Sequence, residues 1–261
     1  MSDIGGILES LYGAGAPAVA RSLGDLIAQW RPRLPRRPAD VALADLSPQF
    51  ALLISYADQV RQTGEAPLKT LHDFCVQHLR GVVSAVHLLP FFPSSSDDGF
   101  AVKDYRSVDP AYGTWDDIAR MAADFELMFD GVFNHVSAQG DWFQRFLAGD
   151  ARYRDFFVSV EGDPDLSGVV RPRALPLLTE FSTAAGRKRV WTTFSADQAD
   201  LNYRNPEVLL AVLEALLFYV SKGARLIRLD AVAFLWKEIG TPCLHLAQTH
   251  RIIQLFRAVL D

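Results

Sequence analysis

Three short polar clusters in this sequence could carry chemistry, and each follows an apolar run of strand length. Arg228 and Asp230 end the run RLIRLD, and side chains two residues apart on a strand point to the same face. A guanidinium beside a carboxylate favours the ionised carboxylate, which suits a nucleophile that attacks without a proton. A salt bridge that merely ends a strand has the same spacing, so spacing alone leaves both interpretations open.

The other two clusters could bind a sugar. Asp97 and Phe100 lie in SSSDDGF, where a carboxylate could accept hydrogen bonds from hydroxyl groups and a ring could cover C–H groups. The same segment could be a simple turn. Asp130, Asn134 and His135 lie in DGVFNH. His135 could donate to a hydroxyl group, or the three side chains could only tie a strand to its loop.

The composition excludes several classes of protein. With 49% hydrophobic and 22% charged residues, the 261-residue chain has the make-up of a soluble globular protein. The net charge of -5 comes without a basic block, which gives no reason to expect binding to nucleic acid or to a membrane surface. We find no secretory signal, no apolar stretch near the roughly 18 residues of a membrane span, and no metal-site spacing. Two cysteines, Cys75 and Cys243, favour a reducing cytoplasm without excluding a disulfide.

Strands and helices must position the three clusters. Residues 1–45 read as mostly helical and include a basic, proline-broken stretch, 31–38, which we interpret as a surface connector rather than an anion-binding patch. Apolar runs then predict strands, and periodic segments predict helices between them. The predicted strands are 50–56, 82–92, 125–133 and 225–232, and the predicted helices are 67–80, 114–123, 205–222 and a last one running to the end.

Residues 136–204 interrupt this alternation. They are rich in Asp, Gly, Pro and aromatic residues, and about 70 residues is too long for a simple connection, so we predict a small inserted domain. Asn205 and Pro206 then have the order of a cap and a first helical residue.

Alternation of strands and helices with right-handed crossovers predicts an α/β fold with a parallel sheet covered by helices. Four such units are half of a (β/α)8 TIM barrel. We therefore predict a helical segment and connector (1–45), a first part of the barrel (46–135), the insertion (136–204) and a continuation carrying Asp230 (205–261). Because half a barrel leaves open edges and uncovered faces, we expect self-association or a second polypeptide that completes the sheet.

The order of the clusters resembles the α-amylase superfamily. The motifs DGVFNH and RLD resemble the first two signature regions of that superfamily, and the long insertion and the helix between them are in the expected order. Three further segments are similar to the sucrose phosphorylase branch: HLLPFFPSSSDDGFAVKDYRSVDPAYGTWDDI, VVRPRALPLLT and IRLDAVAFLWKEIGT. The segment FLWKEIGTPCLHLAQTH is similar to the glucosylglycerate phosphorylase type of that branch. The resemblance runs from about residue 45 to the end and implies an α-amylase-type barrel with the insertion after the third strand.

The resemblance also implies a reaction. Glucose is transferred from sucrose or a glucosylglycerate-like donor to inorganic phosphate, through a β-glucosyl intermediate on the nucleophile Asp230, with Arg228 orienting it. A hydrolase or transglycosidase of the same superfamily, and an inactive remnant, are the alternatives. The acid/base glutamate comes from the fifth strand in this family, beyond the four predicted here, so we expect half an active site. No cofactor is implied, because the leaving group needs a proton and not a metal.

Five further residues receive roles from the resemblance. Asp97 and His135 match residues that bind glucosyl hydroxyl groups, and Phe100 matches an aromatic residue beside the sugar ring. Gln198 matches a polar neighbour of that site, and Arg173 matches a loop arginine that contacts phosphate or the acceptor. Gln198 could instead only hold its loop in place, and Arg173 could simply be solvated.

Overall fold

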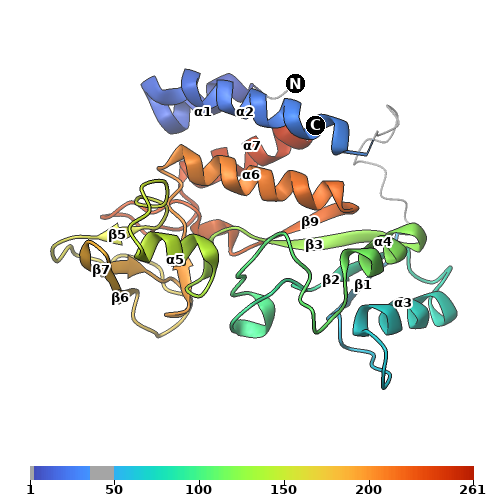
Figure 1. The fold of residues 1–261 in the computed structure, drawn as a ribbon. Coiled ribbons are helices and arrows are strands. Elements are labelled where there is room, and N and C mark those ends of the chain that lie inside the picture. Colours follow the sequence, from blue (N-terminus) through green and yellow to red (C-terminus); the bar gives the residue numbers. More distant parts are fainter. Residues whose placement is uncertain (1–2, 36–49) are drawn as a thin grey trace.

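A four-stranded parallel sheet forms the centre of the computed structural model, which describes residues 3–35 and 50–261 (Figure 1). All neighbouring strands pair in parallel. In spatial order the strands are β1 (Leu52–Ser55), β2 (Ala85–Leu88), β3 (Glu126–Val132) and β9 (Ala224–Asp230). The four predicted strands are therefore confirmed, each shorter than its apolar run. The second is shortened most, at both ends, and Pro90, which cannot donate to the ladder, lies just past its C-terminal end.

Helices connect the strands as expected for parallel pairing. They are α3 (Pro67–His78), α4 (Trp115–Asp124), α6 (Pro206–Ser221) and, after β9, α7 (Ala247–Leu260). The predicted starts of two of them are confirmed by their caps. Thr114 and Asp117 form a capping box on α4, and the Asn205 side chain accepts a hydrogen bond of 3.0 Å from the Glu207 amide on α6.

Removing the Asn205 cap gives the first prediction. The Asn205→Ala variant should lose about 1 kcal/mol of unfolding free energy, because an amide in the first turn of α6 loses its partner. Urea unfolding followed by circular dichroism measures the loss. Asn205→Ser can still cap the helix and should retain most of the stability; an equal loss in both variants would contradict the capping argument.

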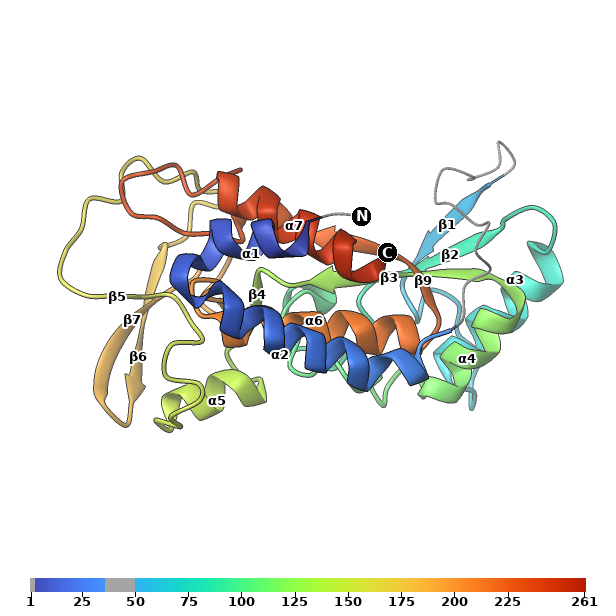
Figure 2. The ribbon, with the colours of Figure 1, turned by 90° about the horizontal axis from the view of Figure 1, so that it is seen from above.

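The N-terminal residues are helical, as predicted. The helices α1 (Ile4–Tyr12) and α2 (Ala16–Trp30) lie against α7 and α6 respectively (Figure 2). The Tyr12 hydroxyl donates to the Tyr203 carbonyl at 3.0 Å, which ties this layer to the end of the insertion. Of the predicted connector, Arg31–Arg33 form a 3-10 turn. Its residues from 36 onward lie outside the described part of the chain.

The insertion lies at one end of the sheet, on the left in Figure 1. Its base is a two-stranded antiparallel pair, β4 (His135–Ser137) with β8 (Gln198–Asp200). A short helix and a three-stranded antiparallel sheet complete it: α5 (Asp141–Leu147), β5 (Ser159–Val160), β6 (Leu178–Thr183) and β7 (Gly186–Trp191). Trp191, Phe156 and Phe157 are buried, as packing residues would be.

The first strand differs from its prediction. The apolar run 50–56 predicts a strand buried on both faces, but the Ile54 side chain is 60% exposed. Within the described sheet β1 and β9 are the outer strands, so the burial of β1 depends on a neighbour on one side alone. Among the described helices, none combines the length and the apolar character needed to cross a membrane.

Candidate active site

A cleft of about 320 Å³ opens at the C-terminal ends of β2, β3 and β9. It is lined by Tyr56, Asp97, Asp98, Phe100, His135, Arg173, Phe194, Arg228 and Asp230. Six of the seven predicted site residues therefore line one cleft. The seventh, Gln198, lies buried beside it and donates to Asp97 Oδ2 at 2.9 Å.

Asp230 is the last residue of β9, and Arg228 lies on the same face of the strand. Arg228 Nη2 is 3.2 Å from Asp230 Oδ1, and Arg228 Nη1 pairs with Asp130 on the neighbouring strand. Asp130 is fully buried and also lies 2.7 Å from His87 Nε2. One guanidinium thus bridges two carboxylates, one of them at the mouth of the cleft.

The surroundings of Asp230 shift its pKa in opposite directions. Burial raises the pKa of Asp230 above the ordinary aspartate value, and the charge of Asp130 adds to this. The His135 ring and the Arg228 guanidinium counteract the rise. The side chain is 18% exposed, so the carboxylate is poorly hydrated but can be reached from the cleft. A poorly hydrated carboxylate beside a fixed cation suits nucleophilic attack.

Asp97 is held by two polar neighbours. Arg173 Nη2 lies 2.9 and 3.0 Å from its two carboxylate oxygens, and Gln198 donates to one of them. Burial by itself would raise the pKa of Asp97, but the hydrogen bonds from Arg173 and Gln198 outweigh it and lower that pKa. Asp97 and Asp98 both have positive φ angles, 56° and 51°, so the loop presents these carboxylates at some cost in backbone strain.

His135 is buried at the root of the insertion. Its Nδ1 lies 3.2 Å from Asn134 Nδ2, and its Nε2 lies 3.1 Å from the Phe100 carbonyl oxygen and 3.2 Å from Gln198 Nε2. Burial lowers the pKa of His135, and the charges of Asp200 and Asp230 oppose this. The ring also packs against Phe194 at 5.1 Å between centroids.

A buried lysine that the sequence did not single out lies behind His135. Lys237 Nζ is 2.7 Å from Asn134 Oδ1 and 2.5 Å from Asp200 Oδ2, and both partners are fully buried. Burial lowers the pKa of Lys237, and Asp200 opposes this. The ion pair joins the end of β3, the base of the insertion and the loop after β9. The sequence contains one indication of this ion pair: a lysine stands in the apolar segment AFLWKEI, and a charge buried there needs a partner.

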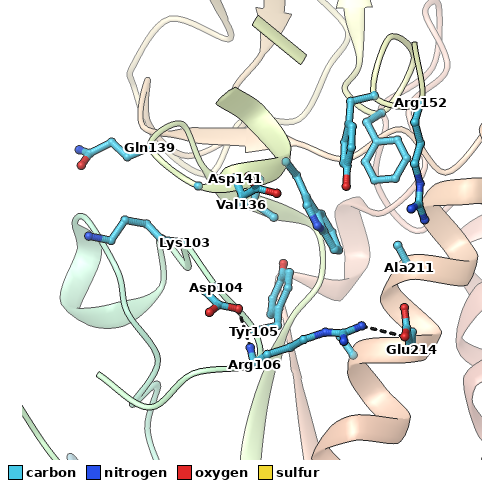
Figure 3. A pocket seen from close by; sticks show the side chains of 15 residues that line it. Lys103, Asp104, Tyr105, Arg106, Val136, Gln139, Asp141, Arg152, Ala211 and Glu214 are labelled. Atoms are coloured by element: carbon cyan, nitrogen blue, oxygen red, sulfur yellow. Dashed lines mark hydrogen bonds and ion pairs between the residues drawn. The ribbon is translucent and has the colours of Figure 1, made fainter. Parts of the chain in front are cut away.

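A larger pocket, of about 470 Å³, lies between α6 and the first part of the insertion (Figure 3). There Arg106 pairs with Glu214 at 2.8 Å, and the Tyr105 hydroxyl donates to the Val132 carbonyl at 2.7 Å. None of the predicted site residues lines this pocket. We therefore place the candidate active site in the smaller cleft.

Comparison with known proteins identifies the family that this fold and cleft define. The model of the α-amylase catalytic domain matches residues 76–255, and the chain belongs to this family. The predicted α-amylase-type fold, present in part, is thereby confirmed.

Known relatives of the chain include glycoside phosphorylases. The chain is 58% identical over 251 residues to a glucosylglycerate phosphorylase of Allomeiothermus silvanus, covering 96% of this chain and 44% of that protein. It is 53% identical to the glucosylglycerate phosphorylase of Spirochaeta thermophila, covering 98% and 44%. The crystal structure of sucrose 6F-phosphate phosphorylase from Thermoanaerobacter thermosaccharolyticum superposes with a TM-score of 0.75 at 31% identity, covering 85% of this chain and 48% of that one. The chain thus spans less than half the length of these relatives.

Proposed function

We propose that this chain carries the nucleophile and the glucosyl-binding side of a retaining α-glucoside phosphorylase. The observation that carries the proposal is the Asp230 carboxylate, paired with Arg228 at a strand end, in one cleft with Asp97 and His135. The similarity to glucosylglycerate phosphorylases supports a glucosylglycerate-like donor over sucrose.

In the proposed reaction Asp230 attacks the anomeric carbon of the α-glucoside. The bond from that carbon to the glycosidic oxygen breaks, and the leaving oxygen takes a proton from a general acid. An oxygen of inorganic phosphate then attacks the β-glucosyl ester and releases Asp230, which gives α-glucose 1-phosphate with net retention. The burial that raises the pKa of Asp230 also leaves its carboxylate weakly hydrated, which suits a nucleophile.

The other residues have proposed roles in binding. Asp97, His135 and Gln198 would bind glucosyl hydroxyl groups, with Phe100 beside the ring. Arg173, which pairs with Asp97 in the present structure, would bind phosphate or the acceptor once a sugar occupies Asp97. Phosphate competes well for a guanidinium because its oxygens match the donor fork.

The wider arrangement is also a proposal. We propose four segments, 1–45, 46–135, 136–204 and 205–261, with the barrel completed by further strands beside β1 and β9, from a second polypeptide or a second copy. Exposed Ile54 on the outer strand supports this. Both cysteines are free and buried, which supports a reducing, cytoplasmic setting.

Trapping of the intermediate tests the proposed nucleophile. α-Glucosyl fluoride should glucosylate the chain, because fluoride leaves without the proton that an alkoxide requires. Intact mass and peptide mapping should place the adduct on Asp230, and Asp230→Asn should form none. A missing adduct, or one on another carboxylate, would reject the assignment. Glucose 1-phosphate formed when phosphate is present would separate a phosphorylase from a hydrolase.

A further inference from the structure

A line of buried polar contacts leads from β2 to the candidate nucleophile. His87 Nε2 is 2.7 Å from Asp130 Oδ2, the Oδ1 of Asp130 pairs with Arg228 Nη1, and Arg228 Nη2 is 3.2 Å from Asp230 Oδ1. His87 is 2% exposed and touches no atom that the proposed reaction changes. The four side chains come from three neighbouring strands, β2, β3 and β9.

The strand register explains this alignment. His87 pairs with Met128, and Asp130 lies two residues further along β3, on the same face. Asp130 pairs directly with Arg228, and Asp230 lies two residues beyond on β9. A period of two on each strand therefore places the whole line on one face of the sheet.

We propose that His87 is a positioning residue for Asp230, acting through Asp130 and Arg228; the inference rests on the proposed role of Asp230 as nucleophile. A carboxylate has two acceptor oxygens. With Oδ2 occupied by His87, Asp130 offers Oδ1 to a single nitrogen of Arg228. The other nitrogen of the guanidinium fork then stays directed at Asp230.

Without His87, both oxygens of Asp130 are free to accept from Arg228. A two-bond pairing between a guanidinium and a buried carboxylate is favourable, so Arg228 would turn toward Asp130 and away from Asp230. The nucleophile would then lose the group that fixes its orientation. The binding groups Asp97 and Gln198 would be unchanged, because no hydrogen bond or ion pair in the described part of the chain joins them to His87.

A second buried histidine offers a matched control. His72 Nε2 lies 2.8 Å from Asp124 Oδ2, and Asp124 Oδ1 pairs with Arg80. The motif of histidine, carboxylate and guanidinium is the same, but it lies between α3 and α4, and the Arg80 side chain is 62% exposed and leads to no catalytic group. Loss of His72 removes an equivalent contact without touching the cleft.

The test compares leucine and glutamine at both histidines. The rate of glucosyl-Asp230 formation from α-glucosyl fluoride should fall roughly 10- to 100-fold in His87→Leu, as expected for a displaced reacting group. The donor concentration at half-saturation should hardly change, since binding and orientation are separate. His87→Gln places an amide nitrogen near the position of Nε2 and should restore most of the rate. His72→Leu and His72→Gln should react like the wild type.

Several outcomes would overturn the inference. They are a wild-type rate in His87→Leu, no recovery in His87→Gln, or an equal loss in His72→Leu, which would make the effect one of general stability. If His87→Leu does not fold, Asp130→Asn tests the same line: it keeps the shape, removes one acceptor oxygen and should slow the reaction similarly. Absence of an adduct in the wild type would reject the proposed nucleophile itself, which is a different result from a wild-type rate in the variants.

Discussion

The Lys237→Met variant is expected to unfold with a free energy about 3–5 kcal/mol below that of the wild-type chain. Methionine fills most of the space of the lysine chain but leaves Asp200 without its cation. Asp200 is fully buried, and its remaining partners are the Asn134 amide and the amide and hydroxyl of Thr193. Neutral donors lessen the cost of a buried charge without replacing a counter-ion.

Urea unfolding measures this loss, and two comparisons make it specific. Lys69 pairs with Glu65 and Asp73 at 3.0 and 3.1 Å on the surface, and Lys69→Met should cost no more than about 1 kcal/mol. Adding Asp200→Asn to Lys237→Met removes the unpaired charge and should recover part of the loss. A Lys237→Met variant as stable as the wild type would mean that the ion pair contributes little beyond its packing.

The loss of Lys237 should also affect the cleft. The ion pair holds the base of the insertion against Asn134, and Asn134 in turn donates to His135. Gln198 lies two residues before Asp200 on β8, so a shift of this strand moves Gln198 relative to Asp97. Sugar binding should therefore weaken in Lys237→Met even below the urea concentrations that unfold it.

Local patterns predict much of this fold. The apolar runs place four strands in the right order, and the residues Thr114 and Asn205 begin two helices where their cap chemistry requires. Spacing by two brings Arg228 and Asp230 to one face. Each of these features depends on a few residues that are adjacent in the chain, which is the range over which sequence patterns are informative.

Features that depend on distant partners are harder to predict. Lys237 meets Asn134 across 103 residues, and His87 meets Asp130 across 43; the sequence does not indicate which distant residue either of them contacts. Arg173 pairs with Asp97 across 76 residues, although the sequence assigned them to different ligands. Ile54 reads as a core residue because an apolar run carries no information about which strands lie beside it. The catalytic roles themselves remain predictions.

Replacing Arg228 should slow glucosylation of Asp230 by about 100-fold or more, and should shift its pH dependence. The attack requires an ionised Asp230, so the rate falls as the pH drops through the pKa of this carboxyl. Burial raises that pKa and the Arg228 guanidinium lowers it. In Arg228→Met the opposing cation is gone, so the pKa of Asp230 rises further. The fall of the rate at low pH, the acid limb of the profile, therefore moves to higher pH.

Three variants separate the charge of Arg228 from its geometry. Arg228→Lys keeps the cation, so its acid limb should stay nearer the wild type, but a lysine cannot bridge Asp130 and Asp230 as a fork, so its rate should remain low. Arg225 lies on the same strand and pairs with Glu126 of β3 at 3.2 Å, far from the cleft, and Arg225→Met should change neither property. The rate of adduct formation, measured across pH in each variant, separates the two effects. An unmoved acid limb in Arg228→Met would mean that burial alone sets the ionisation of Asp230 and that Arg228 acts only through orientation.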